Sequence, residues 1–147
     1  MKKLFLLILG LIFVLGSVFI FLTRTSEIEK KIKIIQINGT VVEVEIADTL
    51  DLREKGLSDR ISLKQGKGIL FVFDTSAQYG FWMKDMNFPI DIVWIDEKFN
   101  VVDIDKGVSP ETFPQVFRPD QEVKYVLELP AGYTNQHLID TSAVVQF

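Results

Sequence analysis

The sequence contains no cysteine and only one histidine. Without cysteine, the protein can form no disulfide bond and no thiolate zinc site, and it has neither a cysteine nucleophile nor a cysteine for lipid attachment. The histidine, His137, has no second histidine with which to build a metal site or activate a nucleophile. We interpret it as a surface residue, and we expect the protein to bind no metal and no cofactor.

The sequence also lacks a phosphate-binding loop and the turn that carries a catalytic serine. Gly66 and Gly68 precede the apolar run Ile69-Leu70-Phe71 rather than the lysine and hydroxyl pair of a phosphate-binding loop. No Gly-x-Ser-x-Gly motif occurs. These absences exclude the commonest enzyme classes.

Basic residues are in the minority. Once Lys2 and Lys3 are set aside, the chain has 14 Lys and Arg against 20 Asp and Glu, a net charge of −6. Affinity for nucleic acids comes mostly from basic side chains that displace the counterions around phosphates. We therefore expect no nucleic-acid partner.

The longest apolar run lies at the N-terminus. Leu4 to Leu22 contains nineteen residues without a charge or a proline. As a helix this run would be roughly 28 Å long, close to the ~30 Å hydrocarbon layer of a bilayer. We interpret residues 1–23 as a membrane anchor and the polar residues 24–30 as a stalk. A cleaved signal peptide is the alternative, with Gly16-Ser17 as its one weak cleavage site.

The charges on either side of this run are nearly balanced. Lys2 and Lys3 favour a cytoplasmic N-terminus, whereas Arg24, Lys30 and nearby lysines lie on the other side of the run. A short basic leader before an apolar segment is typical of export signals. We therefore predict a single-pass membrane protein whose domain faces outside the cytoplasm, or a secreted protein if the segment is cleaved.

Residues 31–147 have the length of one domain, and two local signals stand near its start. Asn38-Gly39 suits the tight turn of a β-hairpin, because both residues of that turn need a positive φ. Asp48 or Thr49 can cap a short helix from Leu50 to Lys55, which Gly56 would end. We expect this to be the one clear helix of the domain.

The rest of the domain predicts strands. Ile69 to Phe73 is a continuous apolar run, the pattern of a strand buried on both faces. Seven or eight short strands with little helix favour an all-β, antiparallel, barrel-like domain over residues 31–147. Further strands are expected in Ile32–Ile37, Val42–Ile46, Ile90–Ile95, Val101–Asp105, Val123–Leu129 and Ala143–Phe147.

Five blocks of sequence, in order, resemble the domain of unknown function 192 family from about Thr40 to Val145. This resemblance implies an all-β, barrel-like domain that is exported or anchored to a membrane, and it implies no established activity. The sequence departs from the family pattern at Ser58, Ile69, Asp85-Met86 and Thr141-Ser142. The blocks are Arg53-x-x-Gly56-Leu57-x-x-Arg60, Gly68-Ile69-Leu70-Phe71, Phe81-Trp82-Met83-Lys84, Pro89-Ile90-Asp91-Ile92 and Val126-Leu127-Glu128-Leu129-Pro130-Ala131-Gly132.

Charged and aromatic residues within these blocks are the candidates for a site. Asp91 lies inside an apolar run, where an unpartnered charge is costly, and Lys84 stands across one tight connection from it. The two could form an ion pair that only neutralises a polar position, or they could line a pocket with Trp82 as its flat apolar wall. The candidate ligand-binding residues are Arg53, Arg60, Trp82, Lys84, Asp91 and Glu128, with Trp94 and Asp85 nearby in sequence.

Three functions stay open on these residues. A binding or accessory module for a polar cell-envelope ligand such as a glycan ranks first, and Arg53 and Arg60 beside Asp91 in one concave pocket would favour it. A hydrolase that pairs Asp91 with Asp85 or Glu128 ranks second, and it needs two carboxyl groups about 5–10 Å apart across a cleft. A purely structural envelope protein ranks third.

Overall fold

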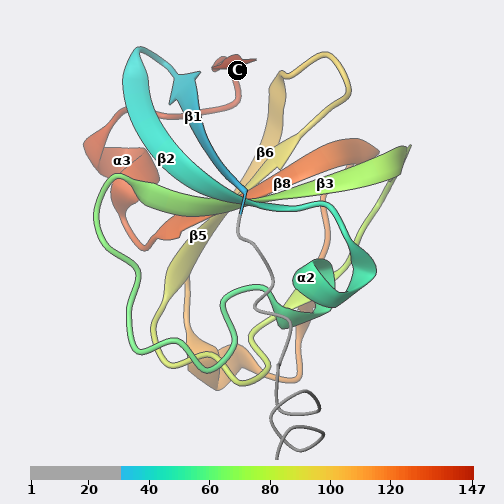
Figure 1. Cartoon of the computed structure of the whole chain (residues 1–147), viewed down its shortest axis with the longest axis vertical. Helices are drawn as coiled ribbons and strands as arrows, with labels where there is room; N and C mark the ends of the chain where they lie inside the picture. Colours follow the sequence, from blue (N-terminus) through green and yellow to red (C-terminus); the bar gives the residue numbers. More distant parts are fainter. Residues whose placement is uncertain (1–30) are drawn as a thin grey trace, which may run out of the picture.

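The computed structural model describes residues 31–147 (Figure 1). The membrane anchor and the stalk predicted for residues 1–23 and 24–30 lie outside the described residues. Within residues 31–147, no helix is both long enough and apolar enough to span a bilayer.

Seven of the strands form one sheet in the order β6-β5-β8-β3-β2-β1-β9, and β4 pairs with β7 in a separate two-stranded sheet. The helices are short, and α2 and α3 lie on opposite sides of the molecule (Figure 1). The strands are β1 (Ile32–Ile37), β2 (Thr40–Ala47), β3 (Lys67–Ala77), β4 (Phe81–Trp82), β5 (Ile90–Ile95), β6 (Val101–Val108), β7 (Val116–Phe117), β8 (Val123–Pro130) and β9 (Val145–Gln146). The helices are α2 (Leu50–Lys55), α3 (Tyr133–Gln136) and the 3-10 helix η1 (Pro110–Thr112).

The large sheet curls into a half-barrel whose two edges meet at one point. Asn100 and Val144, which directly precede β6 and β9, form an isolated bridge. Next to it, the Val101 amide donates to the Ala143 carbonyl over 3.0 Å. The expected barrel-like, all-β architecture is therefore confirmed, although the barrel is joined by one bridge rather than closed by a full ladder.

The expectation of a purely antiparallel sheet was wrong at one pair of strands. Strands β2 and β3 run parallel, with Glu45 opposite Ile69 and Ala47 opposite Phe71. The reason is α2, which lies in the connection between them, because parallel neighbours need a crossover and cannot be joined by a hairpin turn. The helix expected from Leu50 to Lys55 is α2, and α3 adds a single helical turn of four residues.

Both local signals near the start of the domain are confirmed. Asn38 and Gly39 have φ values of 48° and 77° and join β1 to β2, which pair antiparallel. The Thr49 hydroxyl accepts a hydrogen bond from the Leu52 amide over 3.3 Å at the start of α2. Gly56 ends the helix with φ of 46°, a conformation that a β-carbon disfavours.

The half-barrel buries both faces of its sheet. The inner core lies within the curl and includes Leu70 of β3, whereas the outer core includes its neighbours Ile69 and Phe71. This alternation confirms that β3 is buried on both faces. The outer core also contains Leu57, which follows α2, and Met83, which follows β4. The candidate site lies at the surface of this outer core.

Candidate functional site

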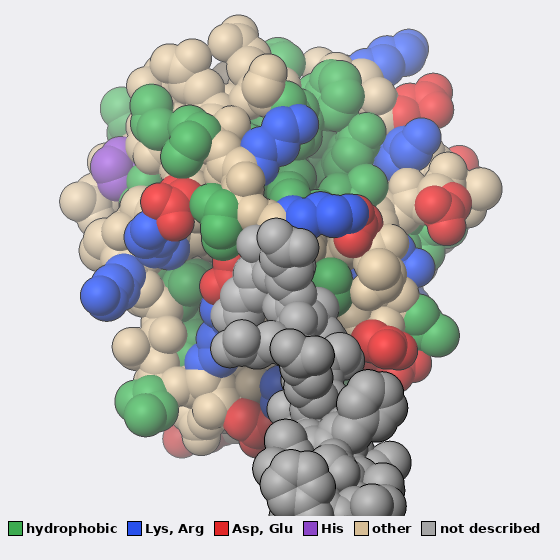
Figure 2. All heavy atoms as spheres, in the orientation of Figure 1, with side chains coloured by type: hydrophobic (Ala, Val, Ile, Leu, Met, Phe, Trp, Pro, Cys, Tyr) green, Lys and Arg blue, Asp and Glu red, His purple; other side chains and the backbone are tan. Residues whose placement is uncertain are grey.

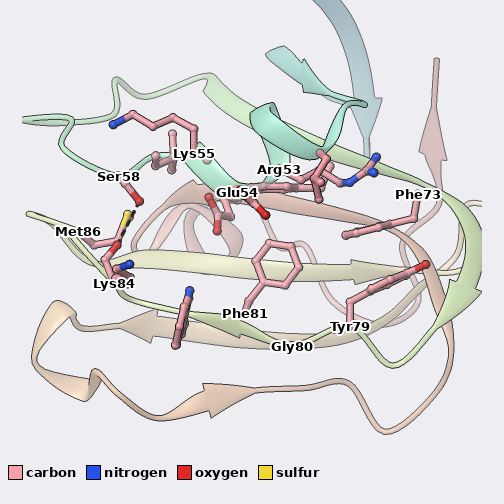
Figure 3. Close-up of a pocket in the computed structure, with 16 residues that line it drawn as sticks. Arg53, Glu54, Lys55, Ser58, Phe73, Tyr79, Gly80, Phe81, Lys84 and Met86 are labelled. Carbon is pink, nitrogen blue, oxygen red and sulfur yellow. Dashed lines mark hydrogen bonds between the residues drawn. The ribbon is translucent and has the colours of Figure 1, made fainter.

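A cavity of about 350 Å³ lies between α2, the end of β3 and β4, on the outer-core side of the sheet (Figure 3). Aromatic and charged side chains line it. Phe81 projects into the middle of these side chains, and Phe73 and Tyr79 lie together at one end. The aromatic lining residues are Phe71, Phe73, Tyr79, Phe81 and Trp82, and the charged ones are Arg53, Glu54, Lys55, Lys84 and Glu128. The cavity therefore brings together four of the six candidate residues, namely Arg53, Trp82, Lys84 and Glu128.

Glu128 is the buried acid of the cavity. It lies on β8, between Ile69 of β3 and Ile92 of β5, and only 6% of the residue is exposed. Its Oε2 atom is buried and has no hydrogen-bond partner among the described residues 31–147. Burial raises the pKa of Glu128 from 4.5 to about 8, against the opposing effect of the Arg60 charge. At neutral pH the side chain is therefore mainly an uncharged carboxylic acid, which can donate a hydrogen bond as well as accept one.

Arg60 does not line this cavity. Its Nη1 and Nη2 atoms donate to the two carboxylate oxygens of Glu45 over 2.6 and 2.8 Å. These hydrogen bonds raise the pKa of Arg60. The pair lines a second, smaller cavity of about 130 Å³, so Arg60 acts on Glu128 through its charge alone.

Arg53 belongs to a wall of stacked side chains. Its Nη1 atom donates to the carbonyls of Asp48 and Val72 over 3.0 and 2.9 Å. The guanidinium lies 5.3 Å from the centre of the Phe73 ring, which stacks on Tyr79 with 3.5 Å between ring centres (Figure 3). Because its Nη1 atom is held by two carbonyls and its guanidinium lies near the Phe73 ring, Arg53 forms a fixed part of the cavity wall.

Trp82 and Lys84 form the open side. Trp82 is 53% exposed, and its ring tilts against Phe113 with 5.7 Å between centres. The Lys84 ammonium lies 5.9 Å from the centre of the Trp82 ring. The Ser58 hydroxyl donates to the Lys84 carbonyl over 3.1 Å, which ties the loop after α2 to the loop after β4 (Figure 3). The next residue, Asp85, is exposed and does not line the cavity.

The predicted pair of Lys84 with Asp91 was wrong. Asp91 alternates along β5 with Ile90 and Ile92 of the outer core, so it points to the inner face of the sheet, away from the cavity. Its side chain is completely buried. Asp91 Oδ1 accepts from the amides of Gly107 and Gly132 over 2.8 and 3.1 Å. Thr134 donates to Oδ2 from its amide and its hydroxyl over 3.0 and 2.7 Å.

These hydrogen bonds give Asp91 a structural role. They join the start of β5 to β6, which carries Gly107, and to the first turn of α3, where Thr134 lies. Trp94 is likewise structural, since it is fully buried and its indole N–H donates to Asp105 over 2.8 Å. Burial raises the pKa of Asp105, while this hydrogen bond acts in the opposite direction.

Comparison with known proteins places the domain in a family. Residues 33–147 match the family named DUF192 and described as "Uncharacterized ACR". The chain belongs to the DUF192 family. No curated protein matches it.

Two solved structures share the fold of this DUF192 domain. One is a proposed transcription regulator from Sinorhizobium meliloti 1021, with a TM-score of 0.77 and 24% sequence identity over 82% of this chain and 97% of that one. The other is a protein of unknown function from Novosphingobium aromaticivorans DSM 12444, with a TM-score of 0.77 and 23% identity over 83% of this chain and 89% of that one. At this level of identity, the likeness supports the fold alone.

The DUF192 cavity also contains residues that the sequence analysis missed. Glu54 and Ser58 line it from α2 and the following loop, and Phe73 and Tyr79 line it from β3 and the loop after it. Helical spacing could have indicated Glu54, because Leu50, Arg53, Glu54 and Leu57 follow the i, i+3, i+4, i+7 pattern of one helix face and all line the cavity. No comparable signal points to Tyr79, which lies in an irregular loop.

Proposed function

We propose that this DUF192 domain is a binding module that holds a polar cell-envelope ligand, such as a glycan, in the cavity beside Glu128. The observation that carries the proposal is the aromatic-walled cavity lined by Glu128, a buried acid whose Oε2 atom has no hydrogen-bond partner within residues 31–147. An unsatisfied buried polar atom costs roughly 1–3 kcal/mol, and a hydroxyl group of a ligand would remove that cost.

The shape and lining of the cavity support the same proposal. Its volume of about 350 Å³ falls within the range of small-molecule sites, which runs from roughly 300 to 1,000 Å³. The exposed ring of Trp82 offers a flat apolar surface on which the C–H face of a sugar can lie. Glu128, Ser58 and Lys84 supply polar groups on the other walls, so the cavity can orient a ligand as well as bury it.

A hydrolase is the second candidate, and the observation that favours it is Glu54. Glu54 and Glu128 line the same cavity, one exposed and one buried, and two acids in such different environments can act as a base and an acid. This pair replaces the predicted use of Asp91, whose oxygens are hydrogen-bonded on the opposite face of the sheet. Release of reducing ends from a bound glycan, and its loss in Glu54→Gln, would establish hydrolysis.

We test the binding proposal with the full chain in a detergent that has no sugar headgroup. Titration with soluble oligosaccharides, including chitin and polygalacturonate fragments, is expected to detect binding that Trp82→Ala weakens about tenfold or more, since it removes the stacking surface. Ile61→Ala serves as the control, because Ile61 is 91% exposed and does not line the cavity. Equal affinity in the native chain and Trp82→Ala would contradict the proposal.

We also propose that residues 1–23 anchor the domain to a membrane with the domain outside the cytoplasm. The nineteen-residue apolar run from Leu4 to Leu22 supports this, because its length matches the hydrocarbon layer. The intact mass of protein extracted from membranes is expected to correspond to the uncleaved chain. A mature N-terminus near Thr23 would instead indicate a secreted protein.

A further inference from the structure

We infer that the ligand is an acidic glycan, whose carboxylate or phosphate lies against Lys84 while its sugar ring stacks on Trp82. This inference rests on the proposed glycan-binding function and names the chemical class of the ligand. It follows from the charges that line the cavity and from which of them already have partners.

Of the two lysines that line the cavity, Lys84 is the one available to an anion. Lys55 forms an ion pair with Asp59, and the Arg53 guanidinium donates to the Asp48 and Val72 carbonyls. By contrast, the ion pairs found within residues 31–147 include none with the exposed Lys84 ammonium. A ligand anion would give that ammonium its missing partner.

The lining of the cavity contains more basic than acidic side chains, even though the chain as a whole is acidic. Its basic lining residues are Arg53, Lys55 and Lys84, and its acidic ones are Glu54 and Glu128. Burial keeps Glu128 mainly uncharged at neutral pH, so Glu54 carries the one negative charge of the lining. The whole chain has a formal net charge of −4. An excess of basic side chains in the lining favours an anionic ligand over a cationic or neutral one.

Backbone hydrogen bonds fix the loop that carries Lys84 at the cavity wall. The Ser58 hydroxyl donates to the Lys84 carbonyl over 3.1 Å, and the Asp59 amide donates to the Asp85 carbonyl over 2.8 Å. These two hydrogen bonds fix the loop after β4 against the loop after α2. The fixed loop keeps the Lys84 side chain next to the Trp82 ring, where its ammonium can reach an anion.

The distance between Lys84 and Trp82 suits one acidic sugar. The ammonium lies 5.9 Å from the ring centre. A sugar stacked on the indole would lie roughly 4 Å above it, at van der Waals contact. A carboxylate or phosphate on the edge of that sugar then comes within the ~4 Å reach of an ion pair with the ammonium.

The test compares matched acidic and neutral ligands on the full chain in detergent without a sugar headgroup. The carboxylate pair is oligogalacturonate and its methyl ester of the same length, and the phosphate pair is mannose 6-phosphate and mannose. In low salt, we expect the acidic member of one pair to bind at least tenfold more tightly than its neutral partner. A preference in the first pair identifies the anion as a carboxylate, and a preference in the second identifies it as a phosphate.

Lys84→Met is expected to bring the ratio of acidic to neutral affinity close to one. Lys84→Arg is expected to keep the preference for the acidic ligand, because the charge remains. Lys98→Met is the control, since Lys98 is exposed on the turn between β5 and β6 and does not line the cavity. Equal binding of acidic and neutral members, or an unchanged preference in Lys84→Met, would overturn this inference while the glycan-binding proposal stands. Failure of every saccharide to bind would overturn both.

Discussion

Replacing Asp91 by Asn is expected to destabilise the protein by about 3–5 kcal/mol, because hydrogen bonds to a buried charge each contribute roughly 1.5–3 kcal/mol. The carboxylate accepts two donors at each oxygen, and an amide can accept at one atom only. In the better orientation, the side-chain amide nitrogen of the new asparagine would face Thr134. The Thr134 hydroxyl can rotate to accept a hydrogen bond from it, but the Thr134 backbone N–H would lose its acceptor. A loss of this size removes a large part of the stability of a typical domain.

Urea unfolding of the full chain in detergent, followed by far-ultraviolet circular dichroism, measures this change. The matched control is Asp85→Asn, because Asp85 is exposed and has φ of 56°, a conformation that asparagine tolerates well. The control is expected to leave the unfolding free energy nearly unchanged. If Asp91→Asn were equally mild, the hydrogen bonds that join β5 to β6 and α3 would not contribute as described.

Replacing Glu128 by Gln is expected to remove a strong dependence of stability on pH. The folded-state pKa of about 8 lies above the usual value of 4.5, so the folded protein holds this proton more tightly than the unfolded chain. The contribution of Glu128 to the unfolding free energy is therefore fully present below about pH 4.5 and is lost as the pH rises to about 8. The loss across that window is on the order of 4–5 kcal/mol.

The difference between the native chain and Glu128→Gln isolates this effect, because the other titrating groups are common to both. Unfolding free energies measured from pH 5 to pH 9 should converge at the acidic end, and the variant should be the more stable protein by several kcal/mol at the alkaline end. Asp105→Asn provides a comparison, since Asp105 has a hydrogen-bond partner in Trp94. Parallel pH profiles for the native chain and Glu128→Gln would show that the Glu128 carboxyl is not held uncharged by burial.

Local features of the fold could be predicted because each follows from a few adjacent residues. The hairpin at Asn38-Gly39 and the helix that starts after Thr49 depend on φ angles and caps, which the residue types dictate. The burial of both faces of β3 follows from its unbroken apolar run. The parallel pairing of β2 with β3 could not be predicted in this way, since it depends on where α2 directs the chain.

The site was predicted only in part, and Asp91 shows why the rest could not be predicted. Asp91 and Glu128 both interrupt apolar strands, and the alternation of side chains says only that each points to the face opposite its neighbours. Which face borders a cavity depends on what packs there: α3 and β6 reach Asp91, whereas α2 and β4 leave space beside Glu128. Trp82 and Lys84 were recognised because aromatic rings and charged side chains adjoin in one short block.

The two tryptophans of the chain allow the most direct test of the binding cavity. Trp82 is 53% exposed at the open side of the cavity, whereas Trp94 is fully buried and donates its indole N–H to Asp105. Their indole N–H signals in a proton–nitrogen NMR spectrum can be assigned with Trp82→Phe. On addition of oligogalacturonate, we predict that the Trp82 signal shifts with saturation while the Trp94 signal stays in place. Unchanged Trp82 and Trp94 signals, or a shift confined to Trp94, would contradict a binding site at this cavity.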